Sequence, residues 1–154
     1  MDVPFVEVAL LLKNLASIAV AFLLALPVGW EREQSERSAG LRTFPLVAMA
    51  SCGYILIAGP ILAGHPEGQA RVIEGLITGI GFIGGGAILK SDGTVRGTAT
   101  AASIWNTGAI GAAVAFNRYE VAILLAVVNF ATLRWLARFK EEAVRKPPPP
   151  AGQS

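Results

Sequence analysis

The chain has 154 residues, of which 53% are apolar and only 16% are charged, and its formal net charge is +2. A typical soluble domain carries about 25% charged residues, so this composition argues against a soluble domain. The length favours a single domain. The sequence contains no Ser/His/Asp set, no HExxH string and only one cysteine, Cys52, and one histidine, His65. We therefore expect no enzymatic activity, no metal site and no bound cofactor.

Charge-free runs organise the chain into five candidate membrane helices. They cover residues 14–30, 43–66, 75–89, 97–117 and 121–133. A helix needs about 20 apolar residues, within a range of about 17–25, to cross the hydrocarbon core. The third run is short and is extended by Val72, Ile73 and Glu74; the fifth is completed if Arg134 reaches the lipid–water interface. We predict an all-α, polytopic membrane bundle of about five transmembrane helices, or four if the third run is re-entrant.

The basic residues predict the orientation of these helices. Ten of the 13 lysines and arginines lie on one side of a five-span arrangement, and the other side holds Lys13, Arg71 and Arg118. Because cytoplasmic loops are enriched in basic residues, we predict that the N-terminus is outside and the C-terminus is inside. Residues 1–139 then form the membrane domain. Residues 140–154 include Pro147 to Pro150, and we expect them to form a disordered, proline-rich cytoplasmic tail.

Glycines are concentrated in the run Gly79–Gly86. Its first six residues match the G-x-G-x-x-G dinucleotide-binding fingerprint, but that motif requires a strand before it and an acidic residue about 20 positions later. Here the region at about that distance reads Thr-Ala-Thr-Ala-Ala, starting at Thr98, without an acidic residue. We therefore interpret the run as a membrane helix whose glycines allow close approach of another helix. The packing candidates are Gly79, Gly81, Gly84 and Gly85.

Charged residues flank the predicted inner ends of the helices. Glu31, Arg32 and Glu33 directly follow the first apolar run, and Arg42 and Arg96 each precede the next one. Charges so near the lipid boundary tend to pair with one another. We predict that these five residues form a polar layer at the cytoplasmic face. Structural ion pairs and a functional polar site explain this placement equally well.

Uncharged polar residues lie deeper in the predicted spans. Asn106 and Asn129 are near the middle of the fourth and fifth runs, so an antiparallel pair of helices places them at similar depth. Thr78 and Thr107 are candidates to join them. Interhelical contacts between such groups are worth about 0.6–2 kcal/mol, so we favour structural contacts over a substrate path.

Four motifs together resemble the membrane domain of the MgtC/SapB family. They are Trp-Glu-Arg-Glu at 30–33, Ala-Gly-Leu-Arg-Thr at 39–43, the glycine run with Ala-Ile-Leu to Leu89, and Gly-Thr-Val-Arg-Gly-Thr-Ala-Thr-Ala-Ala-Ser-Ile-Trp at 93–105. The resemblance implies a multi-pass protein of the bacterial inner membrane, with relatives linked to growth in low magnesium and survival inside host cells. Several relatives carry an ACT-like cytoplasmic domain after the last span. We expect this sequence to lack one, because Pro147–Ser154 leaves no room for it.

Two hypotheses for function follow. The first is a non-enzymatic regulator of ion homeostasis, linked to magnesium limitation or stress, that contacts other membrane proteins, such as a transporter or an ATP synthase, or a second copy of itself. The second is a small ion or solute transporter that works as a homo-oligomer, with its path near Asn106 and Asn129. Both need the lipid bilayer as surroundings, and neither predicts a nucleic-acid partner.

Overall fold

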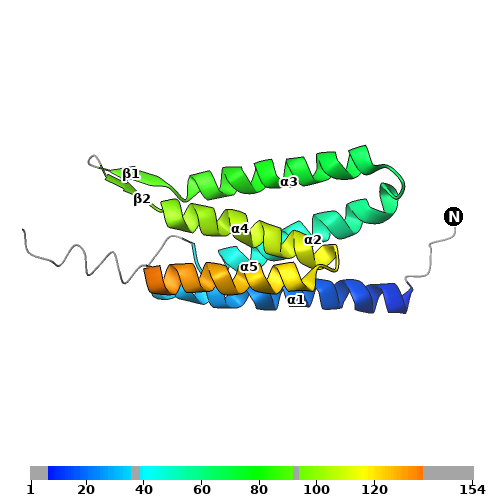
Figure 1. The fold of residues 1–154 in the computed structure, drawn as a ribbon, viewed down its shortest axis with the longest axis horizontal. Coiled ribbons are helices and arrows are strands. Elements are labelled where there is room, and N and C mark those ends of the chain that lie inside the picture. Colours follow the sequence, from blue (N-terminus) through cyan, green and yellow to red (C-terminus); the bar gives the residue numbers. More distant parts are fainter. Residues whose placement is uncertain (1–6, 36–38, 92–93, 137–154) are drawn as a thin grey trace, which may run out of the picture.

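The computed structural model describes residues 7–35, 39–91 and 94–136. Five α-helices follow one another along the chain, and two short strands lie between the third and fourth (Figure 1). The elements are α1 (Val8–Gln34), α2 (Thr43–Ile61), α3 (Pro66–Gly86), β1 (Leu89–Ser91), β2 (Thr94–Arg96), α4 (Thr98–Ala115), α5 (Tyr119–Ala131) and the π-helical turn η1 (Thr132–Leu136).

The predicted all-α membrane bundle is confirmed. Within the part of the chain that the structure describes, three helical segments are long and apolar enough to cross a membrane, namely α1, α2 and the continuous segment Tyr119–Leu136 formed by α5 and η1. Large apolar side chains such as Leu23, Ile57 and Leu124 are 60% or more exposed, as expected for surfaces that face lipid. The tail predicted for residues 140–154 lies outside the described residues.

The connection between α3 and α4 contains more structure than the sequence predicted. The Asp92-Gly93 pair indicated only a tight turn, whereas the flanking residues form an antiparallel pair of strands with Leu89 opposite Arg96. Asp92 and Gly93 themselves lie outside the described residues. We call the end of the bundle that carries β1 and β2 the hairpin end. α1 and η1 terminate at this end, and α2 and α4 begin there (Figure 1).

The core is centred on α4, which packs against all four other helices. Two of its glycines explain how it fits between them. A Cβ atom on Gly111 would collide with the backbone carbonyl of Ala48 in α2, and one on Gly108 would collide with the side chain of Ile80 in α3. Small residues at such positions allow membrane helices to pack closely without a hydrophobic driving force.

By contrast, α3 lies at the edge of the bundle (Figure 1). It contacts α4 and, less extensively, α2. Only Ile80 and Gly84 of this helix are buried, and Phe82 is 85% exposed. Much of the surface of α3 is therefore available to lipid or to another protein.

Candidate functional site

Two of the described arginines at the hairpin end, Arg32 and Arg134, converge on the carboxylate of Glu31. Arg134 Nη1 donates a hydrogen bond to Glu31 Oε2 over 3.1 Å, and Arg32 Nη2 lies 4.0 Å from Glu31 Oε1. The side chains of Glu31 and Arg32 are only 9% and 6% exposed, whereas that of Arg134 is 42% exposed. Two guanidinium groups therefore share one largely buried carboxylate where α1 meets η1.

The π-helical turn brings Arg134 to this cluster. η1 continues α5 for five residues and contacts the end of α1. π-Helical turns are rare in proteins, and those that occur are often found at functional sites. The sequence predicted Arg134 at the lipid–water interface but gave no reason to include it in the polar layer. The structure adds Arg134 to the polar layer, because it binds Glu31. Sequence spacing could not reveal this contact, since 103 residues separate the two.

Glu33 makes no ion pair with a described residue and instead binds the next loop. Its Oε2 accepts a hydrogen bond from the backbone N–H of Leu41 over 3.0 Å. A Cβ atom on Gly40 would overlap this carboxylate, and one on Gly29 would lie 3.3 Å from the carbonyl oxygen of Gly40. The end of α1 and the loop before α2 are thus packed backbone to backbone. This contact gives a physical reason for the Glu-Arg-Glu and Gly-Leu-Arg-Thr motifs to occur together.

The remaining two members of the predicted polar layer are apart from the carboxylates. Arg42 is exposed at the start of α2, and Arg96 is exposed at the end of β2. Among the described residues, no ion pair involves either of them. The predicted layer thus divides into an ion cluster, a loop contact through Glu33 and two exposed arginines.

Gly97 connects β2 to α4 in a conformation that other residues rarely adopt. Its φ is +89°, in the left-handed region, and a Cβ atom would collide with the carbonyl oxygen of Ala87. Glycine is the residue best suited to both conditions. The first turn of α4 is therefore held close to the end of α3 and beside the exposed side chain of Arg96.

The deeper polar residues join α4 to α5. Ser103 Oγ donates to Asn129 Oδ1 over 2.9 Å, and Asn129 Nδ2 donates to the Ser103 carbonyl over 3.4 Å. One turn further along, Asn106 Nδ2 donates to the Leu125 carbonyl over 3.3 Å. Thr107 is fully buried, and its hydroxyl donates to the Ser103 carbonyl over 2.8 Å. The structure thus brings Asn106, Thr107 and Asn129 together and adds Ser103, which the sequence pattern did not single out.

Thr78 lies apart from this group. It is exposed on α3, and its hydroxyl donates to the Glu74 carbonyl of its own helix over 2.8 Å. A threonine hydroxyl can donate its hydrogen bond to a carbonyl of its own helix. Thr78 therefore needs no polar partner on another helix and can lie on the exposed face of α3.

The glycine run forms the last turns of α3, so the strand–turn–helix context of a nucleotide-binding loop is missing here. A Cβ atom on Gly84 would lie 3.0 Å from the carbonyl oxygen of Ala101 in α4, a close helix contact. A Cβ atom on Gly79, Gly81 or Gly85 would meet no atom within 4 Å. No neighbouring described atom lies against these three positions, so the close approach of another helix at Gly79, Gly81 and Gly85 stays a prediction.

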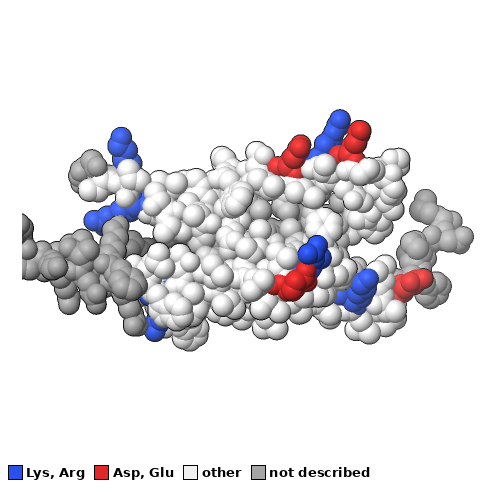
Figure 2. Space-filling model, in the orientation of Figure 1, with Lys and Arg blue, Asp and Glu red and all other residues white. Residues whose placement is uncertain are grey.

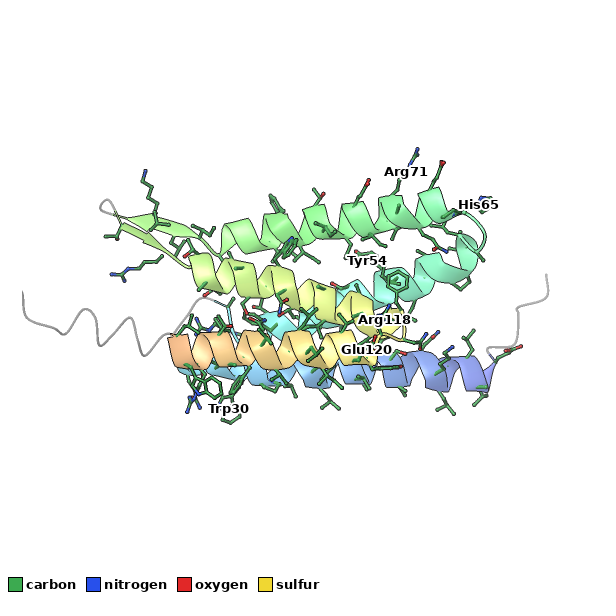
Figure 3. The ribbon with its side chains drawn as sticks, in the orientation of Figure 1. Trp30, Tyr54, His65, Arg71, Arg118 and Glu120 are labelled. Atoms are coloured by element: carbon green, nitrogen blue, oxygen red, sulfur yellow. The ribbon has the colours of Figure 1, made fainter. Side chains whose placement is uncertain are left out.

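Figure 3 shows Trp30 pointing away from the bundle at the hairpin end, and Arg118 and Glu120 together at the start of α5. Trp30 is 58% exposed and directly precedes Glu31, while Trp135 is 63% exposed and directly follows Arg134. Exposed tryptophans favour the headgroup level of a membrane. The two exposed tryptophans beside Glu31 and Arg134 agree with the predicted position of the Glu31 cluster at the membrane boundary, which stays a prediction.

Comparison with known proteins agrees with these features. The MgtC family profile matches residues 18–142. An uncharacterized protein of Synechocystis sp. is 36% identical over 131 residues, which are 82% of this chain and 55% of that protein. Protein MgtC of Brucella abortus is 36% identical over 135 residues, with coverage of 85% and 56%. Protein MgtC of Salmonella typhimurium is 31% identical over 122 residues, with coverage of 79% and 52%.

The chain spans about half the length of the curated relatives it matches. No solved structure matches it. The matched region contains most of α1 and every later described helix, together with the hairpin-end motifs described above. The resemblance found in the sequence is therefore confirmed, and this membrane protein belongs to the MgtC family.

Proposed function

We propose that this protein is a non-enzymatic regulator of ion homeostasis in the bacterial inner membrane, active under magnesium limitation or related stress. It acts by contacting other membrane proteins, for which a transporter, an ATP synthase or a second copy of this chain are the candidates. Membership of the MgtC family supports a membrane protein of this type. The regulatory role and the partners are our proposal.

The observation that carries the proposal is the open surface of α3. A Cβ atom added to Gly79, Gly81 or Gly85 would have no neighbouring atom within 4 Å, although small residues in membrane helices serve mainly to bring a second helix close. Phe82, beside Gly81, is 85% exposed, whereas Gly79 and Ile83 border a cavity between α3 and α2. A helix of another membrane protein fits this combination of small and large apolar residues.

The polar groups inside the bundle support a regulator over a carrier. Asn106, Thr107 and Asn129 each make a hydrogen bond within the bundle, to Leu125 or Ser103. A transport path requires polar groups that can exchange their partners for the substrate. Asn106 and Asn129 already bind Leu125 and Ser103 across the contact between α4 and α5, which suits them better to holding these helices together.

The proposal can be tested by photo-crosslinking in native membranes. A crosslinking amino acid at Gly81 should capture a discrete membrane protein, whereas one at Leu124, which is 63% exposed on α5, should not. Gly81→Leu should remove that crosslink and abolish complementation of growth in low magnesium, while the amount of folded protein stays the same. Magnesium flux into liposomes containing only this protein would instead support the homo-oligomeric transporter.

A further inference from the structure

A polar cavity of about 360 Å³ opens at the hairpin end, between α1, β2 and the start of α4. Its wall includes Arg32, Arg96, Gly97, Thr98 and Thr100. Ligand pockets typically have volumes of about 300–1,000 Å³, so the cavity can hold a small charged group with part of its attached molecule. It lies apart from the open surface of α3 on which the proposed function rests.

The charges around this cavity favour an anion. Arg32 reaches its wall from α1 with a side chain only 6% exposed, and Arg96 reaches it from β2. The carboxylate beside Arg32, that of Glu31, is shared between Arg32 and Arg134. The other described carboxylate at this end, Glu33, binds the Leu41 N–H.

Figure 2 shows only basic groups among the described charged residues on the visible face of the hairpin end, whereas acidic and basic groups are mixed at the opposite end. A divalent cation would be repelled by two guanidinium groups at close range. The two arginines of its wall therefore favour an anion over magnesium as the occupant of this cavity.

The start of α4 adds hydrogen-bond donors to the same wall. α4 is 18 residues long, and its N-cap residue is Gly97, which has no side chain to cap the helix. The first N–H groups of a helix have no partner within the helix, and the helix dipole makes this end positive. Thr98 and Thr100 contribute hydroxyl groups beside them. The two guanidinium groups come from other elements, so the cavity combines three independent sources of positive potential.

We propose that this cavity binds a phosphate group. Guanidinium groups bind phosphate oxygens with paired hydrogen bonds, and a helix N-terminus supplies backbone donors to the same anion. Trp30 and Trp135 place the cavity at headgroup level. The phosphate can therefore belong to a lipid headgroup or to a soluble phosphate compound, and both have the same binding chemistry.

Isothermal titration calorimetry of the full chain in a maltoside detergent, which contains no phosphate, tests the proposal. The probes are inorganic phosphate and dihexanoyl phosphatidic acid. Arg96→Gln should weaken binding of the better probe about tenfold, the loss of one charged hydrogen-bonding group. Arg96→Lys should weaken it less, because the charge remains but the paired geometry is lost. Arg96 is exposed, so these variants should fold, and size-exclusion chromatography checks this.

Lys90→Gln is the matched control. Lys90 is exposed on the neighbouring strand and carries the same charge, but it is not part of the cavity wall. Equal binding of both probes indicates recognition of phosphate itself, and a preference for phosphatidic acid indicates a lipid headgroup; both support the site. The proposal is overturned if neither probe binds, if Arg96→Gln binds as wild type, or if Lys90→Gln weakens binding as much as Arg96→Gln.

Discussion

Arg134 donates a hydrogen bond to Glu31 over 3.1 Å, although 103 residues separate the two in the chain. This contact joins η1 to the end of α1 and closes the bundle at its hairpin end. The Glu31 side chain is 9% exposed, so its carboxylate depends on the two guanidinium groups for solvation that water would otherwise provide. Loss of one member of such a cluster leaves a poorly solvated charge behind.

Glu31→Gln should therefore destabilise the protein by about 2–4 kcal/mol. This is somewhat less than the roughly 3–5 kcal/mol typical of a fully buried ion pair, because Arg134 is partly exposed. The midpoint of thermal unfolding in detergent measures this effect. The matched control is Glu120→Gln, which breaks an exposed pair with Arg118 and should shift the unfolding midpoint much less, because water and salt screen exposed ion pairs. Equal losses in the two variants would show that burial of the Glu31 cluster has no energetic importance.

Removal of both Glu31 and Arg134 should cost less than the sum of the two single substitutions, because no unpaired charge remains. A double-mutant cycle with Glu31→Gln and Arg134→Gln measures this coupling. Arg42→Gln should behave like wild type in the same assay, since Arg42 is exposed and makes no ion pair with a described residue. Strictly additive effects of the first two substitutions would contradict the ion-pair assignment.

Gly111→Ala should lower stability by about 1–3 kcal/mol, the usual cost of overpacking a tight contact, because the new methyl group collides with the Ala48 carbonyl. Gly81→Ala is the control at an open position. It should leave stability unchanged or raise it by up to about 1 kcal/mol through helix propensity. The order of the two unfolding midpoints decides whether close packing lies on α4 or on the exposed face of α3.

Asn129→Ala should reduce stability by about 0.6–2 kcal/mol, the range for polar contacts between membrane helices, because it removes both hydrogen bonds to Ser103. Thr78→Val is the comparison, since Thr78 bonds only to its own helix and is exposed. Its unfolding midpoint should remain within experimental error of wild type. A solute-flux defect in Asn129→Ala without any loss of stability would favour a transport path instead.

Substituted-cysteine labelling tests the predicted orientation. In a Cys52→Ala background, a membrane-impermeant maleimide should label Glu67→Cys in intact cells and should not label Lys90→Cys. The reason is that the hairpin end, with most of the basic residues, should face the cytoplasm. Labelling of Lys90→Cys with none of Glu67→Cys would invert the topology.

The helices could be predicted from the sequence because each one is a local property. Apolar runs of sufficient length, ended by charges and turn residues, specify a membrane helix without reference to the rest of the chain. The Glu31 and Arg32 charges could also be assigned to the boundary, because they directly follow such a run. In these respects composition and spacing were enough to indicate an all-α membrane bundle and the general place of its polar layer.

Partners within the bundle could be assigned only from the tertiary structure, because packing depends on which faces of distant helices meet. Glu31 pairs with Arg134 only once η1 lies beside α1, and Asn129 meets Ser103 only through the register of α4 and α5. The glycines illustrate the same limit. The dense run in α3 was the conspicuous signal, yet Gly111 of α4 makes the tighter contact. A glycine permits another helix to approach closely, but a close contact forms only where the fold places a second backbone beside it.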